Sequence, residues 1–416
     1  MVIKHFGKCP TYRSRGKRCR LDRCRGRLVC LAAEEKVRQD VVMTLTDLYG
    51  YPLSWISTEV TVQAKPRLRA DVVVRAPGED NALIVVECKA RCAELTHADE
   101  AQVAKYCAVL QARYMVLTNR SVTKVWLVDQ EDGNPTDVED VPCYSEAVKH
   151  RPGLCRLHAW ARARAHASGL AVQQSIGSTR VAQQANTIHE DSIVGADSDS
   201  RIQALAMDLH GRITQHEPLF ADPFAWLGHT AVEDLGVGRR PLGNAGGCSW
   251  DSGYRSLLLI DPRGEAHIVR FKVAPGMSWD GVGAYGVPSA RTFLNVMVSD
   301  VLGNHCSLRL CLDRFVTINS KRYVFFHDGK MTPGNKGRLS DADAMDYVAQ
   351  HQQTLVSIDG NAVSLGTLPR SRFLQWDKTW EATRGLLANL AVYAILRDDL
   401  KWKTRRRKRR RRLEHT

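Results

Sequence analysis

The stretch RADVVVRAPGEDNALIVVECKA, residues 69–90, decides the fold of the first part of the chain. Two runs rich in β-branched residues flank APGEDN, a segment with the composition of a turn, so the pattern predicts a β-hairpin. Charged residues stand at one end of each run. Asp71 precedes the first run, and Glu87 and Lys89 come at the end of the second.

Asp71, Glu87 and Lys89 are expected to converge at one edge of this hairpin. Residues two apart on a strand point the same way, so Glu87 and Lys89 share a face while Cys88 points to the other. Two neighbouring carboxylates repel each other, and Mg²⁺ or Mn²⁺ would supply the counter-charge, polarise a phosphate and activate a water molecule. Lys89 would orient or deprotonate that water, or stabilise charge at phosphorus. These residues predict phosphodiester hydrolysis.

Helical and strand patterns surround the hairpin. Residues 32–49 predict a helix, because apolar residues recur there at helical spacing. WISTEVTV, residues 55–62, predicts a strand, residues 98–113 a second helix, and YMVLTN and TKVWLVDQ two further strands. The order α-β-β-β-α-β-β indicates an α/β core with a mixed central sheet.

This segment resembles the PD-(D/E)XK nucleases, whose motif matches Asp71 followed by Glu87-Cys88-Lys89, with Ala70 where the motif has proline. The stretches AEEKVRQDVVMTL, GYP, RADVVV, IVVECKA and AQVAKYCAVLQARYMVLTN are similar to the N-terminal nuclease domain of type I restriction enzyme motor subunits. The resemblance covers roughly residues 30–130. It implies a restriction-endonuclease-like core and a metal-dependent DNA endonuclease of bacterial restriction or anti-phage defence. No helicase motif follows, so we do not expect a complete motor subunit.

The resemblance implies a ligand set for Mg²⁺ or Mn²⁺. Asp71 and Glu87 would bind the metal, and a glutamate of the first helix, Glu35 or Glu34, would complete the site. Without the resemblance, these two glutamates would be explained as first-turn acids that interact favourably with the helix dipole. Glu59, on the first strand, is a further candidate, and a surface role is the alternative for it.

The second helix carries two more candidates. Gln102 and Tyr106 are spaced i, i+4 and therefore share a helix face. They match a Gln-x-x-x-Tyr element that lies near the scissile phosphate in one branch of these nucleases, so Gln102 is predicted to position the phosphate or the water. Arg38 and Gln39 also match family positions, without an assigned role.

Positive charge is concentrated at the two ends of the chain. Residues 1–30 and 401–416 each hold ten Lys or Arg against one acid, so the total of +14 leaves −4 for the residues between them. Cationic segments on a near-neutral body favour binding of a polyanion such as DNA. The predicted phosphate contacts of the tail are Arg405, Arg406, Arg407, Lys408, Arg409 and Arg410. Charge alone does not distinguish DNA from RNA.

The first 30 residues are expected to form a basic arm. Four of the 12 cysteines, Cys9, Cys19, Cys24 and Cys30, lie in it. They could hold zinc, but no CxxC pair is present, and free thiols in a mobile arm are the alternative.

Composition divides the remainder of the chain. We expect a nuclease-like domain over 31–150, a linker over 151–200, an α+β domain over 201–400 and a basic tail over 401–416. A polar loop around His327 and Asp328 could contact phosphate through Lys330, Lys336 and Arg338, or could be an ordinary connection.

Two other functions stay open. The chain could be a catalytically silent nucleic-acid-binding or scaffold protein, or a nuclease gated by a ligand or partner protein at the second domain. One chain offers one site, so cutting both strands would suggest a homodimer. No run approaches the ~18 apolar residues of a membrane span, and the N-terminus lacks a secretion signal, so a cytoplasmic protein without membrane contact is expected.

Overall fold

The computed structural model describes residues 1–3, 10–63, 68–76, 78–149, 193–238, 242–243, 249–250, 253–278, 289–330, 341–357, 360–370 and 376–413. The chain forms two compact units. Unit one comprises Met1–Tyr12 and Lys17–Val181, and unit two comprises Arg13–Gly16 and Ala182–Thr416. Most of the predicted linker, residues 151–200, lies outside the described residues, which resume at residue 193.

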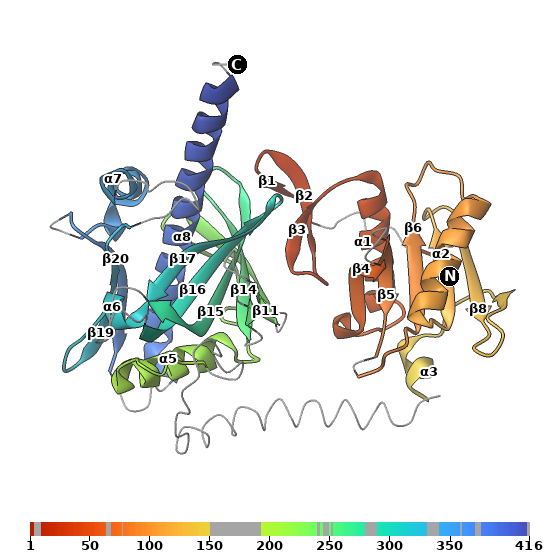
Figure 1. Cartoon of the computed structure of the whole chain (residues 1–416), viewed down its shortest axis with the longest axis horizontal. Coiled ribbons are helices and arrows are strands. Elements are labelled where there is room, and N and C mark those ends of the chain that lie inside the picture. Colours follow the sequence, from red (N-terminus) through yellow and green to blue (C-terminus); the bar gives the residue numbers. More distant parts are fainter. Residues whose placement is uncertain are drawn as a thin grey trace. The chain divides into compact units, whose positions relative to one another are not determined.

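Unit one is built on a six-stranded sheet of order β4-β5-β6-β7-β8-β9 (Figure 1). Its strands are β4 (Ile56–Gln63), β5 (Leu68–Val74), β6 (Ile84–Cys88), β7 (Tyr114–Thr118), β8 (Thr123–Val128) and β9 (Pro135–Asp137). Strands β6 and β7 run parallel and the other neighbours antiparallel. The mixed sheet and its flanking helices agree with the predicted α/β core.

Helices cover both faces of this sheet. Helix α1 (Ala33–Asp47) buries Val37, Val41 and Leu45 in one apolar cluster with residues of β5 and β6. Helix α2 (His97–Leu110) buries Val103 and Tyr106 in a second cluster with the alternate residues of the same strands. The runs of residues 72–74 in β5 and 84–86 in β6 are buried on both faces of the sheet, and Asp71 and Glu87 stand next to these runs.

Residues 12–30 differ from the predicted arm. They form a three-stranded sheet of β1 (Tyr12–Ser14), β2 (Lys17–Asp22) and β3 (Arg27–Cys30). Cys19 and Leu21 alternate with basic residues on β2 and are buried, and Leu28 and Val29 are buried next to each other on β3. The high charge conceals this pattern in the sequence. Cys9 lies outside the described residues, whereas Cys19 is buried, Cys24 is half-buried and Cys30 is exposed.

Unit two contains a six-stranded antiparallel sheet of order β10-β11-β14-β15-β16-β17. The strands are β10 (Phe224–Trp226), β11 (His229–Gly238), β14 (Tyr254–Ile260), β15 (Ala266–Ser278), β16 (Ser289–Asp300) and β17 (Gly303–Cys311). A two-stranded sheet pairs β12 (Leu242–Gly243) with β13 (Ser249–Trp250), and a three-stranded sheet joins β18 (Val316–Ile318), β19 (Arg322–His327) and β20 (Val363–Pro369).

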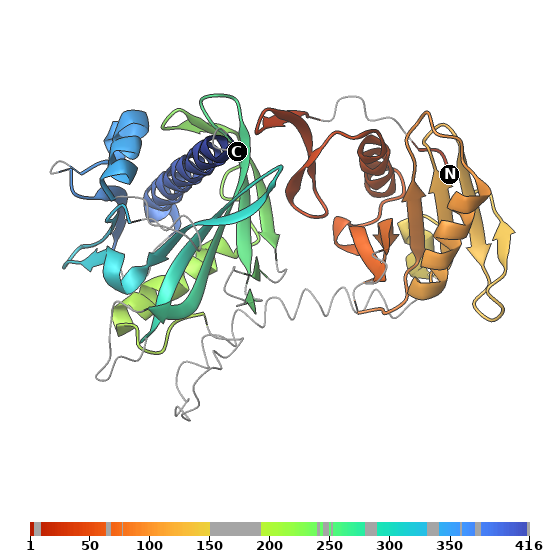
Figure 2. The same cartoon turned by 45° about the horizontal axis from the view of Figure 1, so that its top comes forward.

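Helices α5 (Ser200–Ile213), α6 (Leu312–Phe315), α7 (Asp341–Gln352) and α8 (Trp376–Leu413) complete unit two. Helix α8 packs against β16, β17 and β20 and is the long helix that runs toward the C-terminus (Figures 1 and 2). Leu386, Leu390 and Tyr393 share one face of this helix and are buried. The helix continues to Leu413 and so includes most of the predicted basic tail.

Candidate active site

The hairpin of β5 and β6 places two carboxylates side by side. Val72 pairs with Val86 across the two strands, which sets Asp71 next to Glu87 at the end of this ladder. The Oδ2 atom of Asp71 accepts a hydrogen bond of 2.8 Å from the backbone N–H of Cys88. Glu87 is buried, whereas Asp71 is half-buried. The hairpin predicted from residues 69–90 therefore brings the two acids together.

Both acids resist ionisation when no cation is bound. Burial raises the pKa of Glu87 to about 7, and the charge of Asp71 contributes to this shift. Burial also raises the pKa of Asp71, against the favourable charge of Arg38. The Oε2 atom of Glu87 is buried and accepts no hydrogen bond from any described residue. A cation at this position would remove both penalties.

Lys89 and Gln102 connect Glu87 to helix α2. The Lys89 Nζ lies 3.1 Å from Glu87 Oε1 and 3.2 Å from Gln102 Oε1. The Gln102 amide nitrogen donates to Glu87 Oε1 at 2.9 Å and to the Tyr106 hydroxyl at 2.6 Å. The spacing of Gln102 and Tyr106 thus puts both side chains beside the glutamate and the lysine.

Asp99 is a member of this cluster that sequence reasoning missed. Its Oδ1 atom lies 2.9 Å from Lys89 Nζ. Asp99 also forms a capping box with Thr96, which fixes the carboxylate in the first turn of α2 and holds its pKa at about 2. The only sequence signal for it is the T-x-x-D spacing at residues 96–99 ahead of an apolar helix.

Lys89 carries a permanent positive charge. Burial opposes this charge, but the hydrogen bonds to Asp99 and Glu87 outweigh burial and raise the pKa of Lys89. An ammonium group donates protons in hydrogen bonds and stabilises negative charge, but it does not accept a proton. Of the roles expected for Lys89, orientation and charge stabilisation fit this arrangement, and deprotonation of a water does not.

The glutamates of the first helix differ in their surroundings. Glu35 is buried, lies 2.9 Å from an Arg38 nitrogen and accepts a hydrogen bond of 2.7 Å from Gln39. Glu34 is exposed, and its charge raises the pKa of both Asp71 and Glu87. The electrostatic coupling of Glu34 therefore reaches the acid pair, while Glu35 is bonded to its own helix.

Glu59 belongs to the same cluster through Arg38. Its Oε1 atom lies 2.5 Å from Arg38 Nη1, and its other oxygen pairs with Arg69. The backbone of Glu59 has a φ of 55°, which is uncommon for a residue with a side chain. Thr58 and Val60 on either side pair in register with Val72 and Ala70, so the ladder continues past this residue.

The chemistry of Asp71 and Glu87 fits a divalent metal ion. Hard cations such as Mg²⁺ prefer carboxylate oxygens and retain several waters, and the unpaired Oε2 atom of Glu87 offers such an oxygen. Among the residues that the structure describes, no three His, Cys, Asp or Glu side chains are gathered so that they could hold a metal ion as they stand. Side-chain cations already occupy part of this cluster, namely Arg38 beside Asp71 and Lys89 beside Glu87.

The loop around His327 in unit two has a structural explanation. His327 is buried, and its Nδ1 atom accepts hydrogen bonds from the Tyr393 hydroxyl at 2.9 Å and from the Gly329 N–H at 3.0 Å. Burial lowers the pKa of His327 to about 3, so the ring is neutral. Asp328 pairs with Arg314 and Lys330. Lys336 and Arg338 lie outside the described residues.

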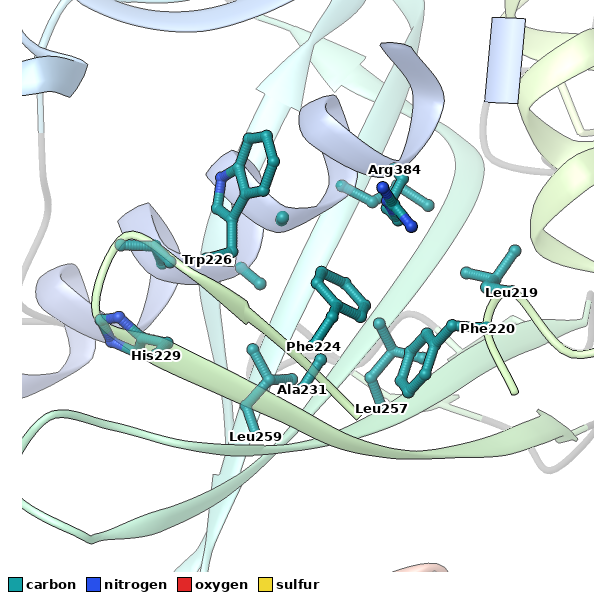
Figure 3. Close-up of a pocket in the computed structure, with 13 residues that line it drawn as sticks. Leu219, Phe220, Phe224, Trp226, His229, Ala231, Leu257, Leu259 and Arg384 are labelled. Carbon is teal, nitrogen blue, oxygen red and sulfur yellow. The ribbon is translucent and has the colours of Figure 1, made fainter. Parts of the chain in front are cut away.

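An apolar pocket lies between α8 and strands β10, β11 and β14 of unit two (Figure 3). Phe224, Trp226, Leu257 and Leu259 line it, and Arg384 is a charged residue at its edge. The enclosed space is about 20 Å³, which is room for one or two water molecules. A nucleotide or a drug-sized ligand does not fit in this conformation. Ligand or partner control through unit two stays a prediction.

The predicted phosphate contacts from Arg405 to Arg410 lie on the last turns of α8, and their side chains lie outside the described part of the structure. Their role stays a prediction. Within the residues described here, no helix is both long and apolar enough to cross a membrane.

Comparison with known proteins finds a family model that matches part of the first unit. Residues 33–142 match the family model of the type I restriction enzyme R protein N terminus. The match confirms the resemblance found in the sequence and spans the elements that carry Asp71, Glu87, Lys89 and Gln102. It points to a nuclease-like role in restriction for this segment. No curated protein and no solved structure matches the chain.

Proposed function

We propose that residues 33–142 are the catalytic domain of a metal-dependent endonuclease that hydrolyses DNA phosphodiester bonds in bacterial restriction or anti-phage defence. The observation that carries the proposal is the convergence of Asp71, Glu87, Lys89 and Gln102 at one end of the hairpin, inside the segment that matches a restriction enzyme family. DNA is preferred over RNA because of that match. Cytoplasmic location is part of the same proposal.

Each residue of the cluster has a role in this proposal. Asp71 and Glu87 would hold Mg²⁺ or Mn²⁺, with Glu34 or Glu35 completing the site. The bound ion would supply counter-charge and a more acidic water. Lys89 would hold the attacking water and stabilise negative charge on the phosphate in the transition state. Gln102, fixed by Tyr106, would orient Lys89 and Glu87 toward the same phosphate.

The β2–β3 hairpin is the proposed contact to the DNA backbone in unit one. Lys17, Arg18, Arg23 and Arg27 are exposed on it. The hairpin is attached to β4, because the Thr58 hydroxyl donates a hydrogen bond of 3.0 Å to the buried carboxylate of Asp22. Thr58 precedes Glu59, so the attachment point is next to the cluster. Basic side chains at this place would hold phosphates without reading the base sequence.

Plasmid cleavage at low salt with Mg²⁺ or Mn²⁺ tests the proposal. The wild-type protein should cut, and Glu87→Ala, Lys89→Ala and addition of EDTA should each abolish cutting. If the cut is double-stranded, the rate should rise with the square of protein concentration, because one chain supplies one site and a homodimer is required. Retained DNA binding without cleavage in any condition would contradict the proposal.

One observation favours a second candidate, a catalytically silent nucleic-acid-binding protein. Arg38 and Lys89 already neutralise the acids without a metal, and the basic hairpin would bind DNA regardless of catalysis. The two candidates differ in the cleavage assay, since only the nuclease needs Lys89.

A further inference from the structure

Arg38 lies at the centre of three carboxylates that come from three different elements. Its Nη1 atom is 2.9 Å from Glu35 on α1 and 2.5 Å from Glu59 on β4, and its Nε atom is 3.2 Å from Oδ1 of Asp71 on β5. The guanidinium is buried. Such a group stays charged in any protein environment, so this cation is a permanent part of the site.

The three contacts of Arg38 are unequal. The contact to Asp71 is the longest, and the Arg38 Nε–H makes no hydrogen bond to any described residue. The contacts to Glu35 and Glu59 both use Nη1 and are shorter. Asp71 is thus joined to Arg38 by charge, of which it supplies the largest favourable share, and not by a directional hydrogen bond to Nε. Asp71 is also a proposed metal ligand.

The backbone of Glu59 supports this arrangement. A positive φ at a glutamate costs free energy and persists only where the surroundings enforce it. Here the carboxylate reaches Arg38 and Arg69. The strained residue thus anchors Arg38 from the strand next to Asp71, while Glu35 anchors it from the helix.

We propose that Arg38 is a built-in counter-cation of the metal site: it holds the carboxylates together without metal, and a divalent ion must displace it from Asp71 in order to bind. This inference rests on the metal site of the proposed function. With Glu34 completing the metal site, Glu35 and Glu59 would keep Arg38 in place after the exchange, so metal binding would cost one ion pair and no unfolding. Arg38 would thereby weaken metal affinity and act as a positioning residue for Asp71.

Removal of the charge tests the inference. Arg38→Met keeps an unbranched side chain and removes the cation. Its affinity for Mn²⁺, measured by isothermal titration calorimetry on the full chain, should rise by about tenfold, because an opposing unit charge within a few ångströms is lost. In EDTA the melting temperature of Arg38→Met should fall below that of the wild type, since three carboxylates then face one another. Addition of Mn²⁺ should raise the melting temperature of the variant by more than that of the wild type.

Arg69→Met is the matched control. Arg69 also pairs with Glu59, but it is half-exposed and its ion pair is with Glu59 and not with Asp71, so its loss should leave Mn²⁺ affinity within about twofold of wild type. Arg38→Lys keeps the charge on a group that cannot span three carboxylates. It should give an intermediate affinity, and it replaces Arg38→Met if that variant does not fold.

The outcomes separate this inference from the proposed function. In one outcome, the wild-type protein binds Mn²⁺ and cuts DNA, and Arg38→Met binds Mn²⁺ no more tightly than the wild type does. This outcome would overturn the role of Arg38 alone. If neither protein bound Mn²⁺, the metal-dependent nuclease would be overturned as well. Binding by Arg38→Met and not by the wild type would support the inference in its strongest form.

Discussion

The carboxylate of Asp99 lies 2.9 Å from the ammonium of Lys89, and the capping box with Thr96 fixes that carboxylate at the start of α2. Lys89 is thus held from both sides, by Glu87 on its own strand and by Asp99 on the helix. A lysine side chain has several rotatable bonds, and two fixed acceptors restrict it to one position. The helix start therefore determines where the positive charge of the site is located.

Asp99 is predicted to act as a positioning residue for Lys89. Asp99→Asn preserves an oxygen for the capping box but removes the charge, so cleavage should fall by about tenfold to a hundredfold. DNA affinity and melting temperature should change little. If Asp99 had a purely structural role, the melting temperature would fall together with cleavage. Glu100→Gln, which alters the next residue of the same helix turn and pairs with Lys124 instead, is the control. Equal losses in the two variants would contradict the prediction.

The stability of the metal-free protein is predicted to depend on Glu87. The pKa of Glu87 is raised from 4.5 to about 7, so the folded state binds this proton more tightly than the unfolded state. The free energy of unfolding should therefore decrease as pH rises from about 4.5 to about 7, by an amount on the order of 3 kcal/mol.

Urea unfolding at several pH values in EDTA measures this dependence. Glu87→Gln should flatten the curve in that window, because the amide does not titrate. Glu94→Gln, at an exposed glutamate that follows the same strand, should leave the curve as in the wild type. An identical slope in wild type and Glu87→Gln would rule out the buried acid as its source.

Divalent metal is predicted to stabilise unit one through Asp71. At a Mn²⁺ concentration about a hundred times the Kd, the melting temperature should rise by about 5 °C, because the ion binds the folded state only. Asp71→Ala should abolish the shift. Asp80→Ala changes an exposed acid at the other end of the same hairpin and should retain it. A shift that survives Asp71→Ala would place the ion elsewhere.

The basic hairpin is predicted to contribute to DNA affinity without sequence preference. Replacement of Arg23 and Arg27 by Gln should lower the slope of log K against log salt by about 2 and weaken binding at low salt by about tenfold or more. Fluorescence anisotropy with a labelled duplex measures both. Arg113→Gln is the control and should leave the slope unchanged. It removes an exposed charge just before β7, at the end of the strand opposite to the one that pairs with Cys88. Failure of the double variant to change the slope would remove the hairpin from the DNA contact.

Local sequence patterns predicted the hairpin of residues 69–90, helices α1 and α2 of unit one and the neighbourhood of Asp71, Glu87 and Lys89. These features follow from short-range rules: side chains alternate along a strand, and residues four apart share a helix face. The same rules placed Gln102 beside Tyr106. In residues 12–30, however, net charge dominated the composition and concealed the alternation that forms β2 and β3.

By itself, the sequence determined which residue types stand at the strand ends and hence the chemistry available to this protein. Only the tertiary structure decided how the charges pair. Arg38 could have faced solvent, and its position among Glu35, Glu59 and Asp71 depends on how α1 packs on β4 and β5. The contact of Asp99 with Lys89 likewise depends on the packing of α2 beside β6. Pairings between elements distant in sequence are set by the packing of whole helices and strands, which no local spacing encodes.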